Sequence, residues 1–242
     1  MTCLIVIPSR MGSTRFPGKP LCDLLGKPMV QWVYEAAVKA NITPNIVIAT
    51  PDQEIIDAAR LFNAPSILTR NDHPSGTDRI AEVATKMPHD FYLNVQGDEP
   101  LIDTEDLKAC AQPLFDDPQI QMASIMADCP ENEIDNHAVV KVVTDLNQNA
   151  LYFSRHAIPF PRNPREAQVK KHVGIYAYRH EVVESFATWP QTPLEITESL
   201  EQLRFMEHGI RIRMAHGKGS ALAVDTPEQA EAVRKLLAEA NS

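Results

Sequence analysis

Residues 3–21, CLIVIPSRMGSTRFPGKPL, decide the fold class of this chain. The first six, 3–8, form an unbroken apolar run, as expected of a strand that is covered on both faces. A loop over 9–20 follows, and then 28–40, PMVQWVYEAAVKA, has helical periodicity with Pro28 at its start. A buried strand followed by a loop and a helix predicts the first unit of a parallel α/β sheet.

The same alternation of strand and helix continues to about residue 120. Short apolar runs alternate with amphipathic segments, which predicts right-handed crossovers and a mostly parallel sheet. Strands are predicted at 45–50, 65–69 and 90–96, and helices at 52–62 (with Asp52 as N-cap), 75–87 and 104–115.

The pattern changes after residue 120, where apolar runs follow one another through short connections. This predicts a mixed or antiparallel portion. Residues 156–168, HAIPFPRNPREAQ, carry three prolines and are predicted to form a loop or an arm that reaches another subunit. Strands are predicted at 121–127, 137–145, 150–155, 169–179 and 210–215, and helices at 180–187, 196–208 and 227–240.

The composition argues against some classes of partner and of location for this protein. The 242 residues carry a formal net charge of -9, which argues against nucleic acid or an anionic membrane as the main partner. No apolar run approaches the roughly 18 residues of a membrane span. The four cysteines (Cys3, Cys22, Cys110 and Cys129) show neither zinc-ligand nor disulfide spacing, which indicates a reducing compartment and a cytoplasmic protein.

Against this acidic background, the loop after the first strand is basic. Residues 9–21 hold three cations and no acid, namely Arg10, Arg15 and Lys19. The carboxyl end of a parallel strand is where α/β proteins bind ligands, and the loop's glycines let backbone amides approach a phosphate. The loop matches neither the Walker A nor the G-x-G-x-x-G pattern. An ordinary basic surface loop is the alternative.

A second candidate site follows the strand predicted at 90–96. In VQGDEP, residues 95–100, Asp98 or Glu99 would face the same crevice and could bind Mg²⁺ through a carboxylate. Neighbouring side chains on an extended chain diverge, so we expect only one of the two to be a ligand. The alternative is a turn with solvated acids.

Three further segments allow two interpretations each. In HVGIYAYR, His172 and Tyr176 share one face of a strand and flank a glycine, where a sugar could fit, although a solvent-facing strand gives the same pattern. Glu201 and Gln202 look like a solvated helix face beside an apolar stripe. Asp225 begins DTPE, a capping-box pattern at the start of the last helix.

Six motifs in this order resemble the CMP-Kdo synthetases, the 3-deoxy-manno-octulosonate cytidylyltransferases. They are IPSRMGSTRFPGKPL, DHPSGTDR, NVQGDEP, ALYFSR, KHVGIYAYR and LEQLR, and they span essentially the whole chain. The resemblance implies a Rossmann-like, mostly parallel sheet of the nucleotide-diphospho-sugar transferase type, with a smaller mixed portion for dimerisation. It implies Mg²⁺-dependent transfer of CMP from CTP to the acidic eight-carbon sugar Kdo for a bacterial surface polysaccharide, lipopolysaccharide or capsule, by a homodimer.

The resemblance also implies a domain division and a role for each site residue. We expect one domain, 1–242, in which 1–120 and 210–242 mainly bind the nucleotide and about 121–209 bind the sugar and dimerise. Arg10, Lys19 and Asp98 would be catalytic, and Asp98 and Asp225 would bind the metal. Ser9, Arg10, Arg15, Lys19, Ser75, Gly76, Arg79 and Gln96 would bind the nucleotide, and Arg155, His172, Tyr176, Glu201 and Gln202 the sugar.

Three other functions remain open at this level. A cytidylyltransferase for a related acidic sugar, such as 8-amino-Kdo or a sialate, would have similar nucleotide loops. A dehydrogenase on a Rossmann sheet is disfavoured because G-x-G-x-x-G is absent. A non-catalytic nucleotide-binding protein would share the basic loop but not the turnover.

Overall fold

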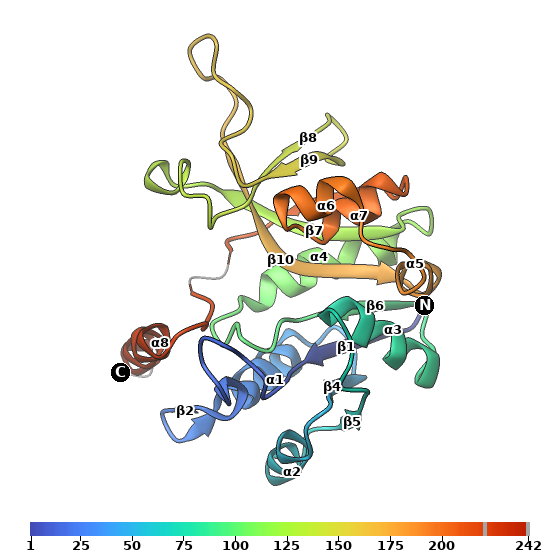
Figure 1. Ribbon diagram of the computed structural model, residues 1–242, viewed down its shortest axis with the longest axis vertical. Helices are drawn as coiled ribbons and strands as arrows, with labels where there is room; N and C mark the ends of the chain where they lie inside the picture. Colours follow the sequence, from blue (N-terminus) through green and yellow to red (C-terminus); the bar gives the residue numbers. More distant parts are fainter. Residues whose placement is uncertain (220–221, 241–242) are drawn as a thin grey trace.

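A central sheet runs through the computed structural model, which describes residues 1–219 and 222–240. Within these residues nine strands form the sheet, and seven of them follow the order β11-β7-β10-β6-β1-β4-β5 (Figure 1). All seven run parallel except β10, which is antiparallel to both of its neighbours. The bounds are β1 Cys3–Pro8, β4 Ile46–Thr50, β5 Ser66–Leu68, β6 Phe91–Asn94, β7 Met122–Asp128, β10 Lys170–Arg179 and β11 Ile212–His216.

Two further strands make the antiparallel portion. β8 (Lys141–Thr144) pairs with β10, and β9 (Ala150–Ser154) pairs with β8. The expected α/β class, a mostly parallel sheet with a smaller antiparallel part, is thereby confirmed. The strand predicted at 137–145 starts only at Lys141, because residues 137–139 form turns and a bend. Residues 156–168 hold neither helix nor strand and project from the body at the top of Figure 1.

Helices cover both faces of the sheet and bury its apolar side chains. One core packs α1 (Met29–Ala40), α2 (Gln53–Leu61) and α4 (Thr104–Asp116) against β1, β6 and β10. The other packs α3 (Gly76–Lys86), α5 (His180–Phe186) and α7 (Gln202–Glu207) against the opposite face. Coverage of both faces explains why β1 and β4 are continuous apolar runs in the sequence.

The prediction of one continuous helix over 196–208 was wrong, because the structure has two helices there. α6 (Pro193–Glu198) ends at Ser199, whose φ of 52° is left-handed, and α7 starts at Gln202. A residue in this conformation ends a helix, although Gly or Asn usually occupies it. The apolar spacing of Leu200, Leu203 and Met206 hid the break.

Several short elements, most of them before α1, were not predicted from the sequence. A short 3-10 helix, η1 (Lys19–Leu21), leads into a two-residue hairpin of β2 (Asp23–Leu24) and β3 (Lys27–Pro28). A second 3-10 turn, η2, spans Glu131–Glu133. The last helix, α8 (Pro227–Ala240), packs its apolar side on Leu24 and Met29. This packing brings the segment that carries Asp225 beside the first loop.

None of the helices in the described parts of the chain is long and apolar enough to cross a bilayer. The four cysteines are unpaired; Cys3, Cys110 and Cys129 are buried and Cys22 is partly buried.

Candidate active site

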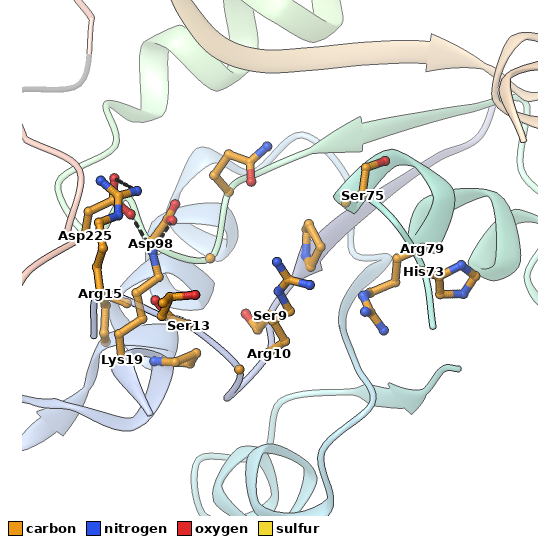
Figure 2. A pocket seen from close by; sticks show the side chains of 18 residues that line it. Ser9, Arg10, Ser13, Arg15, Lys19, His73, Ser75, Arg79, Asp98 and Asp225 are labelled. Atoms are coloured by element: carbon orange, nitrogen blue, oxygen red, sulfur yellow. Dashed lines mark hydrogen bonds and ion pairs between the residues drawn. The ribbon is translucent and has the colours of Figure 1, made fainter. Parts of the chain in front are cut away.

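The carboxyl ends of β1 and β6 open into a pocket of about 390 Å³ (Figure 2). All eight predicted nucleotide-binding residues and both predicted metal ligands line it, although they come from four separate parts of the chain. The lining comprises Pro8, Ser9, Arg10, Gly12, Ser13, Thr14, Arg15, Lys19, Pro20, Met29, His73, Ser75, Gly76, Arg79, Gln96, Gly97, Asp98 and Asp225.

The basic loop folds back on itself to form one wall of this pocket. Gly18 has φ +73°, a conformation that favours glycine, and its N–H donates to the Met11 carbonyl at 3.0 Å. The Met11 N–H donates in turn to the Asp52 carboxylate at 2.7 Å. Asp52 precedes α2 as expected, but its side chain makes no cap hydrogen bond and holds the loop instead.

Two carboxylates and one ammonium group lie at the centre of the pocket. Lys19 Nζ contacts Asp98 Oδ2 at 2.6 Å and Asp225 Oδ1 at 2.9 Å, and Arg15 contacts the second oxygen of Asp225 at 2.9 Å. Burial alone would lower the pKa of Lys19, but the two carboxylates outweigh it and the pKa is raised. Lys19 is therefore a fixed cation at neutral pH.

Asp98 and Asp225 fit the demands of Mg²⁺. Both carboxylates contact the same ammonium group, so they are close enough to bind one cation together. The described residues contain no group of three or more His, Cys, Asp or Glu side chains that could hold a metal. Mg²⁺ is usually bound by one or two carboxylates together with substrate phosphates, which agrees with this pair.

The capping box at the last helix lies one residue later than predicted. The backbone N–H groups of Asp225 and Thr226 donate to Gln229 Oε1, and Gln229 N–H returns a bond of 3.4 Å to Thr226 Oγ1. Thr226 and Gln229 thus form the reciprocal pair, in the pattern T-x-x-Q. The assignment of the cap to Asp225 and Glu228 was wrong, and the Asp225 carboxylate points into the pocket (Figure 2).

Two arginines form the opposite, cationic side. Arg79 is 3% exposed, and its guanidinium donates to Thr69 and to the Arg70 carbonyl. Burial and then the nearby charge of Arg10 lower the pKa of Arg79. Arg10 has no acidic partner within the described residues. Neither arginine forms an ion pair within the described residues, although Glu82 and Asp52 act on Arg79 from further away, and two such cations beside one cavity suit a polyanion.

The pocket also depends on residues that the sequence did not single out. A Cβ on Gly97 would lie 2.3 Å from Ser9 Oγ, so only glycine lets the 95–100 segment approach the first loop. The Ser9 hydroxyl is buried and has no hydrogen-bond partner among the residues that the structure describes. His73, which pairs with Glu82, lies on the pocket wall within the motif DHPSGTDR and could have been found there.

Ser75 caps a helix and also lines the pocket, and its predicted binding of the nucleotide stays a prediction. Its hydroxyl accepts from the Asp78 N–H at 3.2 Å and so caps α3, while the residue lines the pocket. The N-terminus of α3 borders the pocket through Ser75 and Gly76, a position where an anionic or polar ligand group would be stabilised.

None of the five predicted sugar-binding residues is among those that line this pocket. The rings of His172 and Tyr176, on β10, are 5.3 Å apart, so they share a face as predicted. Glu201 accepts a hydrogen bond from Thr77 on α3, and burial raises the pKa of Glu201. Gln202 is 4% exposed and its Nε2 has no partner within the described residues. A solvated helix face is therefore ruled out for Glu201 and Gln202.

Arg155 stands apart from the other four. Its Nε donates to the Glu198 carbonyl at 2.8 Å, and its two terminal nitrogens donate to the carbonyls of His137 and Ser199. In this structure Arg155 holds the turn between α6 and α7. A sugar carboxylate would have to displace at least one of these carbonyls.

Glu99 did not diverge into solvent, as the alternative interpretation required. Its Oε2 is buried without a hydrogen-bond partner in the described part of the chain, and burial, then Asp98 and Asp106, raise the pKa of Glu99 to about 7. Of the neighbouring pair, Asp98 faces the pocket and Glu99 points away from it toward Gly174.

The sheet, the cationic loop and the paired carboxylates define a nucleotidyltransferase, and comparisons with known proteins agree. The family model described as cytidylyltransferase matches residues 4–212, and the chain belongs to this family.

Its relatives include two enzymes named 3-deoxy-manno-octulosonate cytidylyltransferase. The one from Escherichia coli is 46% identical over 236 residues, covering 98% of this chain and 96% of its own. The one from Acidobacterium capsulatum is 43% identical over 240 residues, covering 99% and 98%.

Solved structures give the same grouping. CMP:2-keto-3-deoxy-manno-octonic acid synthetase in complex with CTP superimposes with a TM-score of 0.97 at 45% identity, covering 99% of this chain and 100% of that one. The 4-diphosphocytidyl-2C-methyl-D-erythritol synthase of Anaerococcus prevotii has a TM-score of 0.65 at 10% identity, covering 97% and 98%, which shows the shared fold alone.

Proposed function

We propose that this protein transfers CMP from CTP to the anomeric hydroxyl of Kdo, giving CMP-Kdo and pyrophosphate. The observation that carries the proposal is the single pocket in which Arg10, Arg15, Lys19 and Arg79 surround two carboxylates, in a chain of the cytidylyltransferase family. The near-full-length similarity to enzymes named for Kdo supports this sugar as the acceptor.

The chemistry is an in-line displacement at phosphorus. The anomeric hydroxyl of Kdo gives its proton to water and its oxygen forms a bond to the α-phosphorus of CTP. The bond from that phosphorus to the oxygen of the leaving pyrophosphate breaks. Negative charge grows on the departing group, where Arg10, Arg15 and Lys19 stabilise it. This mechanism needs no covalent nucleophile, and we assign no side chain as the general base.

The carboxylates of Asp98 and Asp225 are the proposed Mg²⁺ ligands. A bound Mg²⁺ would neutralise phosphate charge and lower the pKa of the attacking hydroxyl. Asp225 lies on the segment that α8 packs against the first loop, so the ligand pair forms only when these two parts of the chain meet.

We propose that His172, Tyr176, Glu201 and Gln202 bind the sugar, and that Arg155 is the partner of its carboxylate. Arg155 can present two parallel N–H groups to a carboxylate, a geometry that lysine lacks. The buried amide of Gln202 and the carboxylate of Glu201 supply polar groups suited to sugar hydroxyls.

We further propose a homodimer in the cytoplasm that serves bacterial surface polysaccharide synthesis. The projecting segment 156–168 carries Phe160, which is 84% exposed, as expected of a contact with a second copy. The four unpaired cysteines suit a reducing compartment.

A pyrophosphate-release assay with CTP and a series of acceptors tests the reaction. We expect turnover with Kdo that depends on Mg²⁺, and much slower turnover with 8-amino-Kdo and with sialate. Turnover with sialate and none with Kdo would reject the acceptor. Absence of pyrophosphate with every acceptor, despite CTP binding, would favour a non-catalytic nucleotide-binding protein.

A further inference from the structure

The side chain of His172 is held in one orientation by its surroundings. Its ring lies 5.0 Å from the ring of Phe153 and 5.3 Å from that of Tyr176, between centroids. Its backbone N–H donates to the Val140 carbonyl at 2.8 Å. A ring fixed in this way presents its two nitrogens in defined directions.

The strand that carries His172 is irregular just beyond it. The register between β10 and β7 shifts between Val173 and Tyr176, so the ladder is interrupted there. Ser124 of β7, fully buried, lies opposite the interruption. Its Oγ is 2.8 Å from the Ile175 carbonyl, 3.4 Å from the Val173 carbonyl and 3.0 Å from Nε2 of His172.

These three contacts fix where the protons lie. A serine hydroxyl has one proton to donate, and a backbone carbonyl can only accept. If the Ser124 proton went to His172, lone pairs of Oγ would face two carbonyl oxygens without a proton between them. The Ser124 hydroxyl therefore donates to the Ile175 carbonyl, and Nε2–H of His172 donates to Oγ.

The other ring nitrogen is left as an acceptor. Burial lowers the pKa of His172 to about 3, so the ring is neutral and carries a single proton at physiological pH. With that proton on Nε2, Nδ1 has a bare lone pair. No partner of Nδ1 lies among residues 1–219 and 222–240.

We propose that Ser124 is a positioning residue that holds His172 in the Nε2–H tautomer, so that Nδ1 accepts a hydrogen bond from a hydroxyl group of the sugar substrate. This inference rests on the proposed function in placing a sugar beside His172. The same nitrogen would distinguish between ligand groups, since Nδ1 can accept a hydrogen bond from a hydroxyl but repels a carboxylate at the same position.

Two substitutions isolate the Ser124 hydroxyl. Ser124→Ala removes the oxygen and leaves the rest of the strand, whereas Ser124→Thr keeps the oxygen. Ser185→Ala is the matched control, because the Ser185 hydroxyl also donates to a backbone carbonyl, that of Glu181 at 2.7 Å, but lies in α5 away from His172. Thermal unfolding of each variant checks that it folds.

The first readout is the ¹⁵N chemical shifts of the histidine side chains in uniformly labelled protein, with the His172 signals assigned from the His172→Gln variant. We expect the Nε2–H pattern in the unmodified protein and in Ser185→Ala. Ser124→Ala should show a mixture of tautomers, and Ser124→Thr should restore the single form. An Nδ1–H pattern in the unmodified protein would overturn the proposal, even if Ser124→Ala fails to fold.

The second readout is steady-state kinetics of pyrophosphate release. Loss of one oriented hydrogen bond should raise the KM for Kdo about tenfold in Ser124→Ala and leave the KM for CTP unchanged. A tautomer mixture without a change in the KM for Kdo would overturn the role in sugar binding. An unmodified protein that does not turn over Kdo would reject the proposed function. The ¹⁵N pattern would still show which ring nitrogen of His172 carries the proton.

Discussion

Lys19 is the residue on which the pocket depends most directly, because one ammonium group contacts both metal-ligand candidates. We expect Lys19→Ala to lower kcat by roughly 10²- to 10³-fold, since it removes a fixed cation from the developing charge. Pyrophosphate release under saturating CTP measures this.

Lys39→Ala is the control, because Lys39 is exposed on α1 away from the pocket. It should leave kcat unchanged and cost less than about 0.5 kcal/mol of unfolding free energy. Equal turnover in the two variants would contradict the assigned role of Lys19.

Asp225 can be tested as a metal ligand separately from the helix start. Thr226 and Gln229 cap α8, so Asp225→Asn leaves that cap in place. We expect the Mg²⁺ concentration for half-maximal activity to rise roughly tenfold or more, because a charged ligand is lost. An unchanged Mg²⁺ requirement together with a large fall in melting temperature would show that Asp225 has only a structural role.

His172 makes stability depend on pH. Its pKa falls from 6.5 to about 3 on folding because of burial, so the unfolded chain binds the proton more tightly. The stability that the neutral ring provides is complete above pH 6.5 and is lost progressively as the pH falls toward 3.

Urea unfolding of the unmodified protein and of His172→Gln, at several pH values across this window, measures the effect. The difference in unfolding free energy should move in favour of His172→Gln as the pH falls. A difference that is independent of pH would mean that His172 titrates normally in the folded state.

At the level of single residues, the sequence could place the site but not every contact in it. Arg10, Lys19 and Asp98 follow strand ends, so their convergence followed from the parallel topology. The role of Asp225 could not be decided locally, since DTPE and TPEQ are both capping patterns that overlap. Only the packing of α8 selects the second.

Among the elements, strand and helix alternation was predictable because burial on both faces produces long apolar runs. The hairpin of β2 and β3 was missed because two-residue strands have no periodicity to detect. The break between α6 and α7 was missed because the apolar spacing continues across Ser199.

Ser199 itself gives a prediction at the scale of elements. Its left-handed φ of 52° strains a residue with a Cβ, and glycine would relieve that strain. We expect Ser199→Gly to raise the free energy of unfolding by about 0.5–1 kcal/mol, measured by urea denaturation.

If the helix were continuous at this position, Ser199→Gly would lower the free energy of unfolding, because glycine costs about 1 kcal/mol in a helix interior. Arg155 donates to the Ser199 carbonyl, which glycine retains, so this contact should not obscure the result.

On the scale of the whole molecule, we predict that two copies of the chain associate through segment 156–168. We expect light scattering to give twice the mass of one chain. Phe160→Asp should shift the population toward monomer, because it places a charge where an exposed aromatic side chain would be buried.

Leu61→Asp is the matched control, since Leu61 is 87% exposed on α2 at the opposite end of the molecule from the segment (Figure 1). A monomer in the unmodified protein would reject the dimer. A dimer that Phe160→Asp leaves intact would place the contact elsewhere.

Lys19 contacts Asp225, which lies 206 positions further along the chain. This separation has a consequence for the synthesis of the protein on the ribosome. Asp225 follows every strand of the described sheet in the sequence, so the strands emerge from the ribosome before it does. A nascent chain can therefore assemble most of its sheet while its acidic pair is still incomplete. With Asp225 as the proposed metal ligand, we expect activity to appear only after translation has delivered the segment that leads into α8.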